Sequence, residues 1–152
     1  MQKSKELYEK RISLTLAGFQ ATEWLLKEYI ALSYDVMRCL LRDYVDFSLS
    51  GRDIENYSLE RLIATFKTIN GNQDLIRLLQ SVVTHRNKIA HKSLLPLYGA
   101  ETSDQQYWHL IDEISPLESD IDRCMSGMQA EIDKLSSKSE SVLGVRRSPA
   151  FR

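Results

Sequence analysis

Residues 23–47 read EWLLKEYIALSYDVMRCLLRDYVDF, and this stretch decides the fold class. Its apolar side chains recur every three to four positions, as they do on one face of an amphipathic helix. It contains neither proline nor glycine, so no residue in it breaks a helix. The same spacing extends back towards the N-terminus, and we expect one long helix over residues 3–47 that Gly18 kinks or divides.

Two shorter helices follow, each with its own start signal. Ser58 suits the N-cap of a helix over residues 59–69, and Gly71 is expected to supply the left-handed conformation that ends it. Asn72 is expected to cap the next helix, over residues 73–92, whose apolar positions again recur at helical spacing.

A last helix is expected to begin near Ser103 and to run to about residue 135, with Pro116 kinking it or splitting it in two. The chain after it is polar, with several serines and a basic end, and this composition favours a flexible segment. We therefore predict an all-α fold: a four- to five-helix antiparallel bundle over residues 1–136, followed by a flexible basic tail over residues 137–152.

The composition is typical of a soluble globular protein. The 152 residues are 43% hydrophobic and 27% charged, and a net charge of −1 leaves only a local basic patch for binding nucleic acid. No apolar signal region follows Met1 and no apolar run is long enough to span a membrane, so we expect a cytoplasmic protein without membrane contact. Cys39 and Cys124 lie among apolar residues, and we expect two buried thiols rather than a disulfide or a zinc site.

The stretch best suited to chemistry is residues 84–92, THRNKIAHK, which continues the helix over residues 73–92. Asn87 and His91 are four positions apart and share a helix face, whereas Arg86 and His91 are five apart, about 140° around the helix. One rigid helix does not aim both side chains at one atom. A second copy of the helix in a symmetric dimer can supply the missing group, and the small Ala90 lets two helices approach closely.

These residue types fit the chemistry of a phosphodiester. Histidine, here His91, exchanges protons near neutral pH, and the guanidinium of Arg86 can stabilise charge on a phosphate. Asn87 can orient a phosphate oxygen or the histidine ring. The adjacent basic side chains are candidates for contacts with the substrate backbone, and they are His85, Lys88 and Lys92.

Residues 86–91, RNKIAH, resemble the motif of the HEPN superfamily: an arginine, a polar residue, a few more residues and a histidine near the end of a helix. The resemblance implies a homodimer whose two motifs meet, and a metal-independent endoribonuclease without cofactor, of the toxin or antiviral-defence type. It also implies attack of an RNA 2′-hydroxyl on the adjacent phosphorus, with His91 as acid and base, Arg86 stabilising the phosphate and Asn87 positioning it. An antitoxin or other defence protein is then a further partner.

One position departs from the pattern of some HEPN toxins, which carry a tyrosine two residues after the histidine as the target of a modifying antitoxin. Ser93 stands there, so control by that route is not expected, although Tyr98 lies a few residues on. Two alternatives stay open. One is a HEPN domain without catalysis that binds a partner protein, a nucleotide or RNA. The other is a plain helical dimerisation protein with a coincidental motif, in which Arg86 and His91 lie far from their symmetry mates. For Arg86 and His91 themselves, the alternative to catalysis is a helix-end ion network or a contact that only holds a dimer together.

Overall fold

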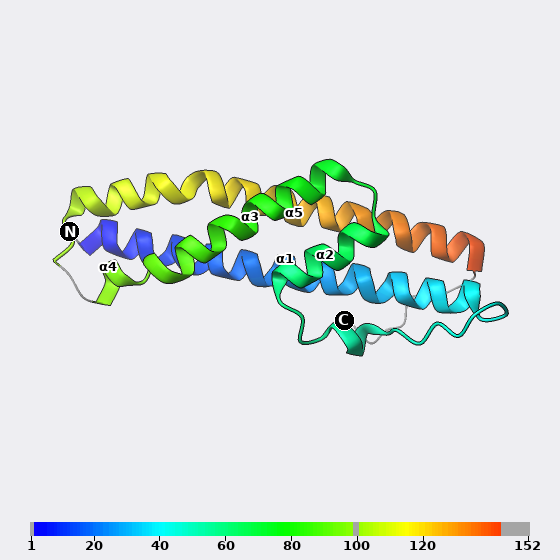
Figure 1. Cartoon of the computed structure of the whole chain (residues 1–152). Coiled ribbons are helices and arrows are strands. Elements are labelled where there is room, and N and C mark those ends of the chain that lie inside the picture. Colours follow the sequence, from blue (N-terminus) through cyan, green and yellow to red (C-terminus); the bar gives the residue numbers. More distant parts are fainter. Residues whose placement is uncertain (1, 99–100, 144–152) are drawn as a thin grey trace.

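The computed structural model describes residues 2–98 and 101–143, and this part of the chain is helical with no strand (Figure 1). Two 40-residue helices, each about 60 Å long, lie side by side and run in the same direction along the molecule: Ser4 near the start of the first contacts Asp104 at the start of the second, and Arg11 further along pairs with Glu118. The shorter helices α2 and α3 lie across this pair, α2 against α1 and α3 against α5. The elements are α1 (Gln2–Leu41), the 3₁₀ helix η1 (Gly51–Ile54), α2 (Leu59–Ile69), α3 (Gln73–Lys92), α4 (Leu95–Tyr98) and α5 (Asp104–Leu143). The predicted all-α helical bundle is confirmed. The expected antiparallel arrangement is wrong for its two longest helices, because α3 takes the chain back towards the end at which α1 begins, and α5 starts there.

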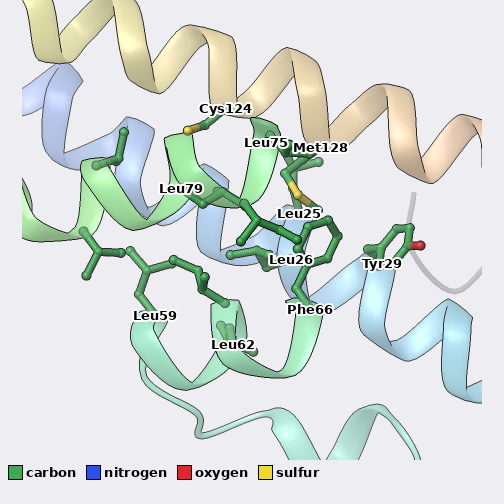
Figure 2. Close-up of a cluster of buried hydrophobic side chains, with 14 of the residues drawn as sticks. Leu25, Leu26, Tyr29, Leu59, Leu62, Phe66, Leu75, Leu79, Cys124 and Met128 are labelled. Carbon is green, nitrogen blue, oxygen red and sulfur yellow. The ribbon is translucent and has the colours of Figure 1, made fainter. Parts of the chain in front are cut away.

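The main core lies where all four longer helices meet (Figure 2). Leu26 of α1, Phe66 of α2, Leu79 of α3 and Met128 of α5 are at most 1% exposed. Tyr29 packs edge-on against Phe66, with ring centroids 5.0 Å apart. Each helix therefore contributes one apolar face to a shared interior, and this burial holds α3 in place.

A second apolar cluster fixes the other end of the bundle, where α3 finishes. Tyr8 of α1 and Tyr107 of α5 are both buried there, with ring centroids 5.7 Å apart. Their hydroxyl groups donate hydrogen bonds to the backbone carbonyls of Ser93, at 2.8 Å, and of Pro96, at 2.9 Å. Ile89 of α3 packs against both clusters. The end of α3 is thus tied to both long helices.

Gly18 neither kinks nor divides α1, which is unbroken from Gln2 to Leu41. A Cβ atom at Gly18 would lie 2.6 Å from Cγ2 of Ile121, a distance that such atoms do not adopt. A Cβ atom at Gly127 of α5 would likewise lie only 2.8 Å from Cδ1 of Leu75. Both glycines therefore allow close approach of helices, and the expectation of a break at Gly18 was wrong.

The predicted end of the first helix, at residue 47, was also wrong, because α1 stops at Leu41. Residues 42–46 are all exposed, so another helical turn there would bury nothing. The chain instead folds back: the Arg38 guanidinium donates a 2.7 Å hydrogen bond to the carbonyl of Leu49, and Phe47 packs edge-on against Tyr34 at 5.7 Å between centroids.

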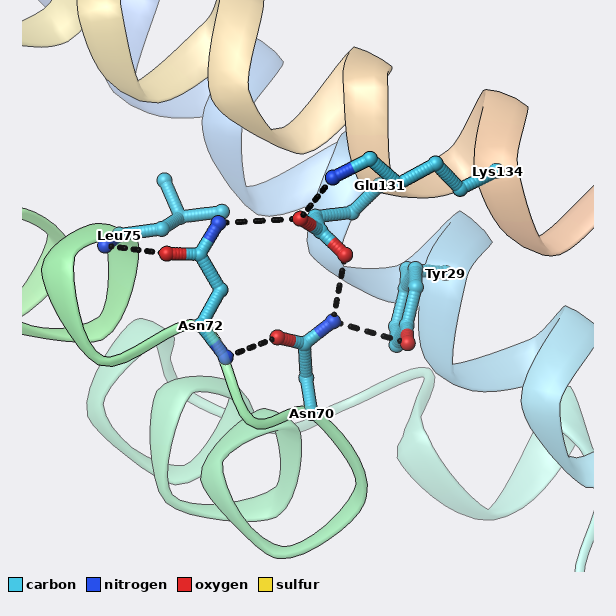
Figure 3. A network of polar contacts seen from close by, with 6 residues as sticks. All are labelled: Tyr29, Asn70, Asn72, Leu75, Glu131 and Lys134. Carbon is cyan, nitrogen blue, oxygen red and sulfur yellow. Dashed lines mark hydrogen bonds and ion pairs between the residues drawn. The ribbon is translucent and has the colours of Figure 1, made fainter.

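The turn between α2 and α3 is shaped by asparagines and not by glycine (Figure 3). Asn70 ends α2 with φ −135° and ψ 136°, an extended conformation, so the left-handed end expected at Gly71 does not form. Ser58 caps α2 as predicted, accepting a 3.3 Å hydrogen bond from the backbone N–H of Arg61. Asn72 caps α3 as predicted, its Oδ1 atom accepting from the N–H of Leu75 at 3.1 Å.

Glu131 of α5 joins this turn to the long helices. Asn70 donates one hydrogen bond to Glu131 and another to the hydroxyl of Tyr29, both 2.9 Å long. Asn72 donates to the other carboxylate oxygen at 3.0 Å, and Lys134 adds an ion pair at 3.2 Å. Burial raises the pKa of Glu131, but these hydrogen bonds and the Lys134 charge outweigh it and lower the pKa below its ordinary value of 4.5. The start of α3 is therefore held by a fully partnered network.

Helix α5 passes through Pro116 as one helix, so the expected split does not occur; the ring lies on an exposed position. The helix also continues past the predicted end near residue 135, as far as Leu143. Ser136 and Ser139 are buried there, and the Ser139 hydroxyl is satisfied by the carbonyl of Leu135 at 2.7 Å. Residues 137–143 of the predicted tail over residues 137–152 are therefore helical, and residues 144–152 lie outside the described part of the chain.

The two cysteines are not equivalent. Cys124 is buried between the helices as predicted, and burial raises the pKa of its thiol to about 12. Cys39 is exposed, so the expectation of a second buried thiol was wrong. Met37 still packs against the core, but the last turn of α1 extends past the helices that bury the rest of it. Leu40 in this turn is 50% exposed.

Candidate functional site

The second half of α3 leaves the core after Val83. Over residues 84–92 no side chain is buried, and only Arg86 and Ile89 are half-buried. Ile89 contacts both apolar clusters, and Ser93, which caps the helix, is buried and accepts the Tyr8 hydrogen bond at its carbonyl. The exposed motif is therefore mounted on a rigid helix that is anchored at both of its ends.

One flank of this half-helix carries the three predicted catalytic residues. Asn87 and His91 are exposed together with Ala90 between them, and Arg86 is half-buried at their base. Arg86 and His91 are separated by about 140° around the axis, as the spacing predicts. Within the described residues, none of the three side chains makes a hydrogen bond or an ion pair. The ion network that would give Arg86 and His91 a purely structural role is not formed within the subunit.

The opposite flank carries the three predicted substrate-contacting residues. His85, Lys88 and Lys92 line a cavity of about 430 Å³ between α3 and α5. Apolar side chains form its floor, and Glu113 stands on the α5 side. Arg86, Asn87 and His91 are not among its lining residues. The structure therefore divides the six predicted site residues into two groups of three on different flanks of one helix.

The charges around this cavity favour an anion. Lys88 and Lys92 are four positions apart on α3, where like charges repel one another, and neither forms an ion pair within the described residues. Glu113, the carboxylate in the lining, already faces the ring of His109, with Nε2 3.4 Å from its Oε1 atom. A phosphate between the two ammonium groups would relieve their repulsion.

Glu113 is a site residue that our sequence reasoning did not single out. Its position four residues after His109 was an available signal, since such pairs share a helix face. The aromatic residues beside His109 differ from each other: Tyr107 is buried, whereas Trp108 is 48% exposed.

A second cavity, of about 480 Å³, lies at the other end of α3 against α5. Asp74 and Asp122 contribute carboxylates to its lining, and Arg123 is held in an ion pair with Asp120 at 3.3 Å. This cavity is therefore a poorer place for a phosphate than the one beside Lys88.

No group of three or more histidine, cysteine, aspartate or glutamate side chains in residues 2–98 and 101–143 is arranged to hold a metal ion. Among the same residues, no helix combines the length and the apolar character needed to cross a bilayer. No protein family, curated protein or solved structure matches the chain.

Proposed function

We propose that the chain is a metal-independent endoribonuclease of the HEPN type, active as a homodimer in a toxin or antiviral-defence system. The observation that carries the proposal is the state of the RNKIAH motif: Asn87 and His91 are exposed and Arg86 is half-buried on an anchored helix, and none of the three has a partner in its own subunit. Because no contact within the subunit holds these side chains, they are available to a ligand.

The proposed reaction needs a base, an acid and a group that stabilises charge. A neutral His91 accepts the proton of the RNA 2′-hydroxyl while that oxygen attacks the phosphorus, and the P–O5′ bond breaks. The same His91, now protonated, gives this proton to the departing 5′-oxygen. Arg86 stabilises the charge on the phosphate oxygens, and Asn87 orients one of them. The products are a 2′,3′-cyclic phosphate and a 5′-hydroxyl, and no metal takes part.

A second subunit is part of this proposal because of the angle between Arg86 and His91. Within one chain the two side chains diverge, so the Arg86 of one copy is proposed to act with the His91 of the other. Ala90, exposed between Asn87 and His91, leaves room for the two helices to approach. The flanking cavity lined by Lys88 and Lys92 is proposed to bind the RNA backbone beside the scissile bond.

The test is cleavage of single-stranded RNA in excess chelator. Arg86→Ala and His91→Ala are each expected to lower the rate at least about 100-fold, the contribution of a positioned acid or base. Arg77→Ala is the matched control, because Arg77 lies on the same helix, is exposed and pairs with Asp74 at the end of α3 away from the motif. Full cleavage by both motif variants would overturn the assignment.

Mixing the two inactive variants tests the composite site. If each Arg86 works with the His91 of the second copy, a mixed dimer of Arg86→Ala and His91→Ala keeps one complete pair and regains activity. Failure to regain activity, in mixed dimers shown to form, would place each complete set within one subunit.

A non-catalytic HEPN domain is the second candidate, and the same 140° divergence favours it, since one subunit does not assemble the catalytic groups. This candidate expects RNA or partner binding that survives His91→Ala and no cleavage by any preparation.

A further inference from the structure

A row of side chains on α1 lies at the surface although two thirds of it is apolar. We name it the α1 outer stripe, and it consists of Lys10, Leu14, Ala17, Ala21, Trp24 and Glu28. Leu14 is 60% exposed and Trp24 is 50% exposed, both high values for large apolar groups in the middle of a 40-residue helix. The stripe lies roughly opposite the face of α1 that enters the main core through Phe19 and Leu26. The fold itself therefore leaves this face uncovered.

The spacing of the α1 outer stripe is that of a coiled-coil seam. Successive members are four, three, four, three and four positions apart, so they stay on one line along the helix. The line is about 27 Å long from Lys10 to Glu28, at 1.5 Å per residue. The stripe ends at Glu28 because the next position, Ala31, is covered by Gly51. The two lie so close that a Cβ atom built on Gly51 would be 3.1 Å from the Cβ of Ala31.

The stripe is complementary to itself when two copies run antiparallel. With a two-fold axis beside residue 19, Lys10 faces Glu28 of the second copy, Leu14 faces Trp24, and Ala17 faces Ala21. Charged pairs of opposite sign then flank the large apolar pairs, and two alanines meet at the centre, where the helices can come close. A parallel, in-register pair would instead set Lys10 against Lys10 and Glu28 against Glu28.

We propose that the α1 outer stripe binds a second copy of this chain through antiparallel α1–α1 packing. The charged side chains on and beside the stripe are compatible with this packing. Arg11 and Lys27 lie about 100° from the stripe on opposite sides of it, so they do not meet across the axis, and they are already paired, Arg11 with Glu118 and Lys27 with Glu23 at 3.0 Å. Lys10 and Glu28 have no ion pair within the described residues, so their charges are available to the second copy.

This contact is separate from the one proposed for catalysis, and it does not depend on the chain being a nuclease. The α1 outer stripe and α3 lie on different sides of α1, because α3 meets the core face of the bundle. A chain that uses both contacts assembles beyond a dimer, whereas a chain that uses only the α1 outer stripe forms a dimer with its two motifs apart.

Charge reversal with rescue tests the proposal in solution. Sedimentation equilibrium should show self-association of the wild-type chain, weakened about tenfold or more in Kd by Lys10→Glu, since each symmetric contact then carries two repulsive pairs. Glu28→Lys should weaken it equally, and the double variant Lys10→Glu/Glu28→Lys should restore it. Both positions are at the surface, so circular dichroism should show unchanged helix content. A subunit number that neither single variant alters would overturn the proposal, and so would a monomeric wild-type chain.

Cross-linking tests the antiparallel register independently. In a Cys39→Ser background, which removes the exposed thiol, Lys10→Cys with Glu28→Cys should give a disulfide-linked dimer under mild oxidation. Lys10→Cys alone should not, because the two copies of residue 10 then lie about 27 Å apart along the seam. A cross-link from the single variant, or none from the double variant, would exclude this register. RNA cleavage measured on the same variants separates this result from the fate of the proposed nuclease site.

Discussion

The two ends of α3 differ in how their polar side chains are hydrogen-bonded. At the first end, Asn70, Asn72, Glu131 and Tyr29 satisfy one another through hydrogen bonds of 2.9 to 3.0 Å. At the other end, the side chains of residues 86–88 and 91–92 make none within the described residues. No buried side-chain nitrogen or oxygen in the described part of the chain lacks a partner, so the difference is one of exposure and not of poor packing. The polar groups that hold this turn are hydrogen-bonded to one another, whereas the polar side chains of the motif have no partner in their own subunit.

The largest effect is expected where α3 enters the core. Leu79 is 1% exposed among side chains from all four longer helices, so Leu79→Ala should lower the free energy of unfolding by about 2–5 kcal/mol. Urea unfolding followed by circular dichroism measures it. Leu95→Ala is the matched control, because Leu95 is 67% exposed and its truncation should change stability by less than about 0.5 kcal/mol. Equal effects of the two truncations would contradict the description of the core.

A smaller effect is expected from the saturated network, and it should depend on pH. The pKa of Glu131 is lower in the folded chain than its ordinary value of 4.5, so its contribution to stability is present above pH 4.5 and is lost as the pH falls through the folded pKa. Glu131→Gln has no carboxylate to titrate there. The difference in unfolding free energy between wild type and Glu131→Gln should therefore be larger at pH 7 than at pH 3. If the difference in unfolding free energy were the same at both pH values, the negative charge of Glu131 would not be what stabilises this network.

The smallest effect on stability is expected at the free end. Arg86→Ala and His91→Ala remove side chains that contact no polar partner in their own subunit, so each should change the free energy of unfolding by less than about 0.5 kcal/mol. Measured beside the RNA assay, this separates a loss of cleavage from a loss of folding. If Arg86→Ala or His91→Ala destabilised the fold as much as Leu79→Ala, the motif would have a structural role, and the two ends of α3 would not differ as described.

The sequence alone determined what depends on neighbours along the chain. The helix starts at residues 59 and 73 were predicted correctly because Ser58 and Asn72 cap backbone groups only three positions away. The motif residues were found because their spacing on one helix is fixed by helical geometry. The exposure of Cys39, the end of α1 at Leu41 and the continuation of α5 to Leu143 could not be found in this way, since each depends on which distant segment covers that surface.

The tertiary structure also decided how the site residues are grouped. Only the packing of α3 against α5 puts His85, Lys88 and Lys92 into a cavity with Glu113 and leaves Arg86, Asn87 and His91 on the free flank. The same holds for Leu14 and Trp24, which a periodicity argument assigns to a helix but cannot assign to an inner or outer face without knowing where the other helices lie. A helix cap depends on residues a few positions apart, so it can be predicted from the sequence. Burial depends on contacts between residues that are distant in the sequence, and only folding brings those residues together.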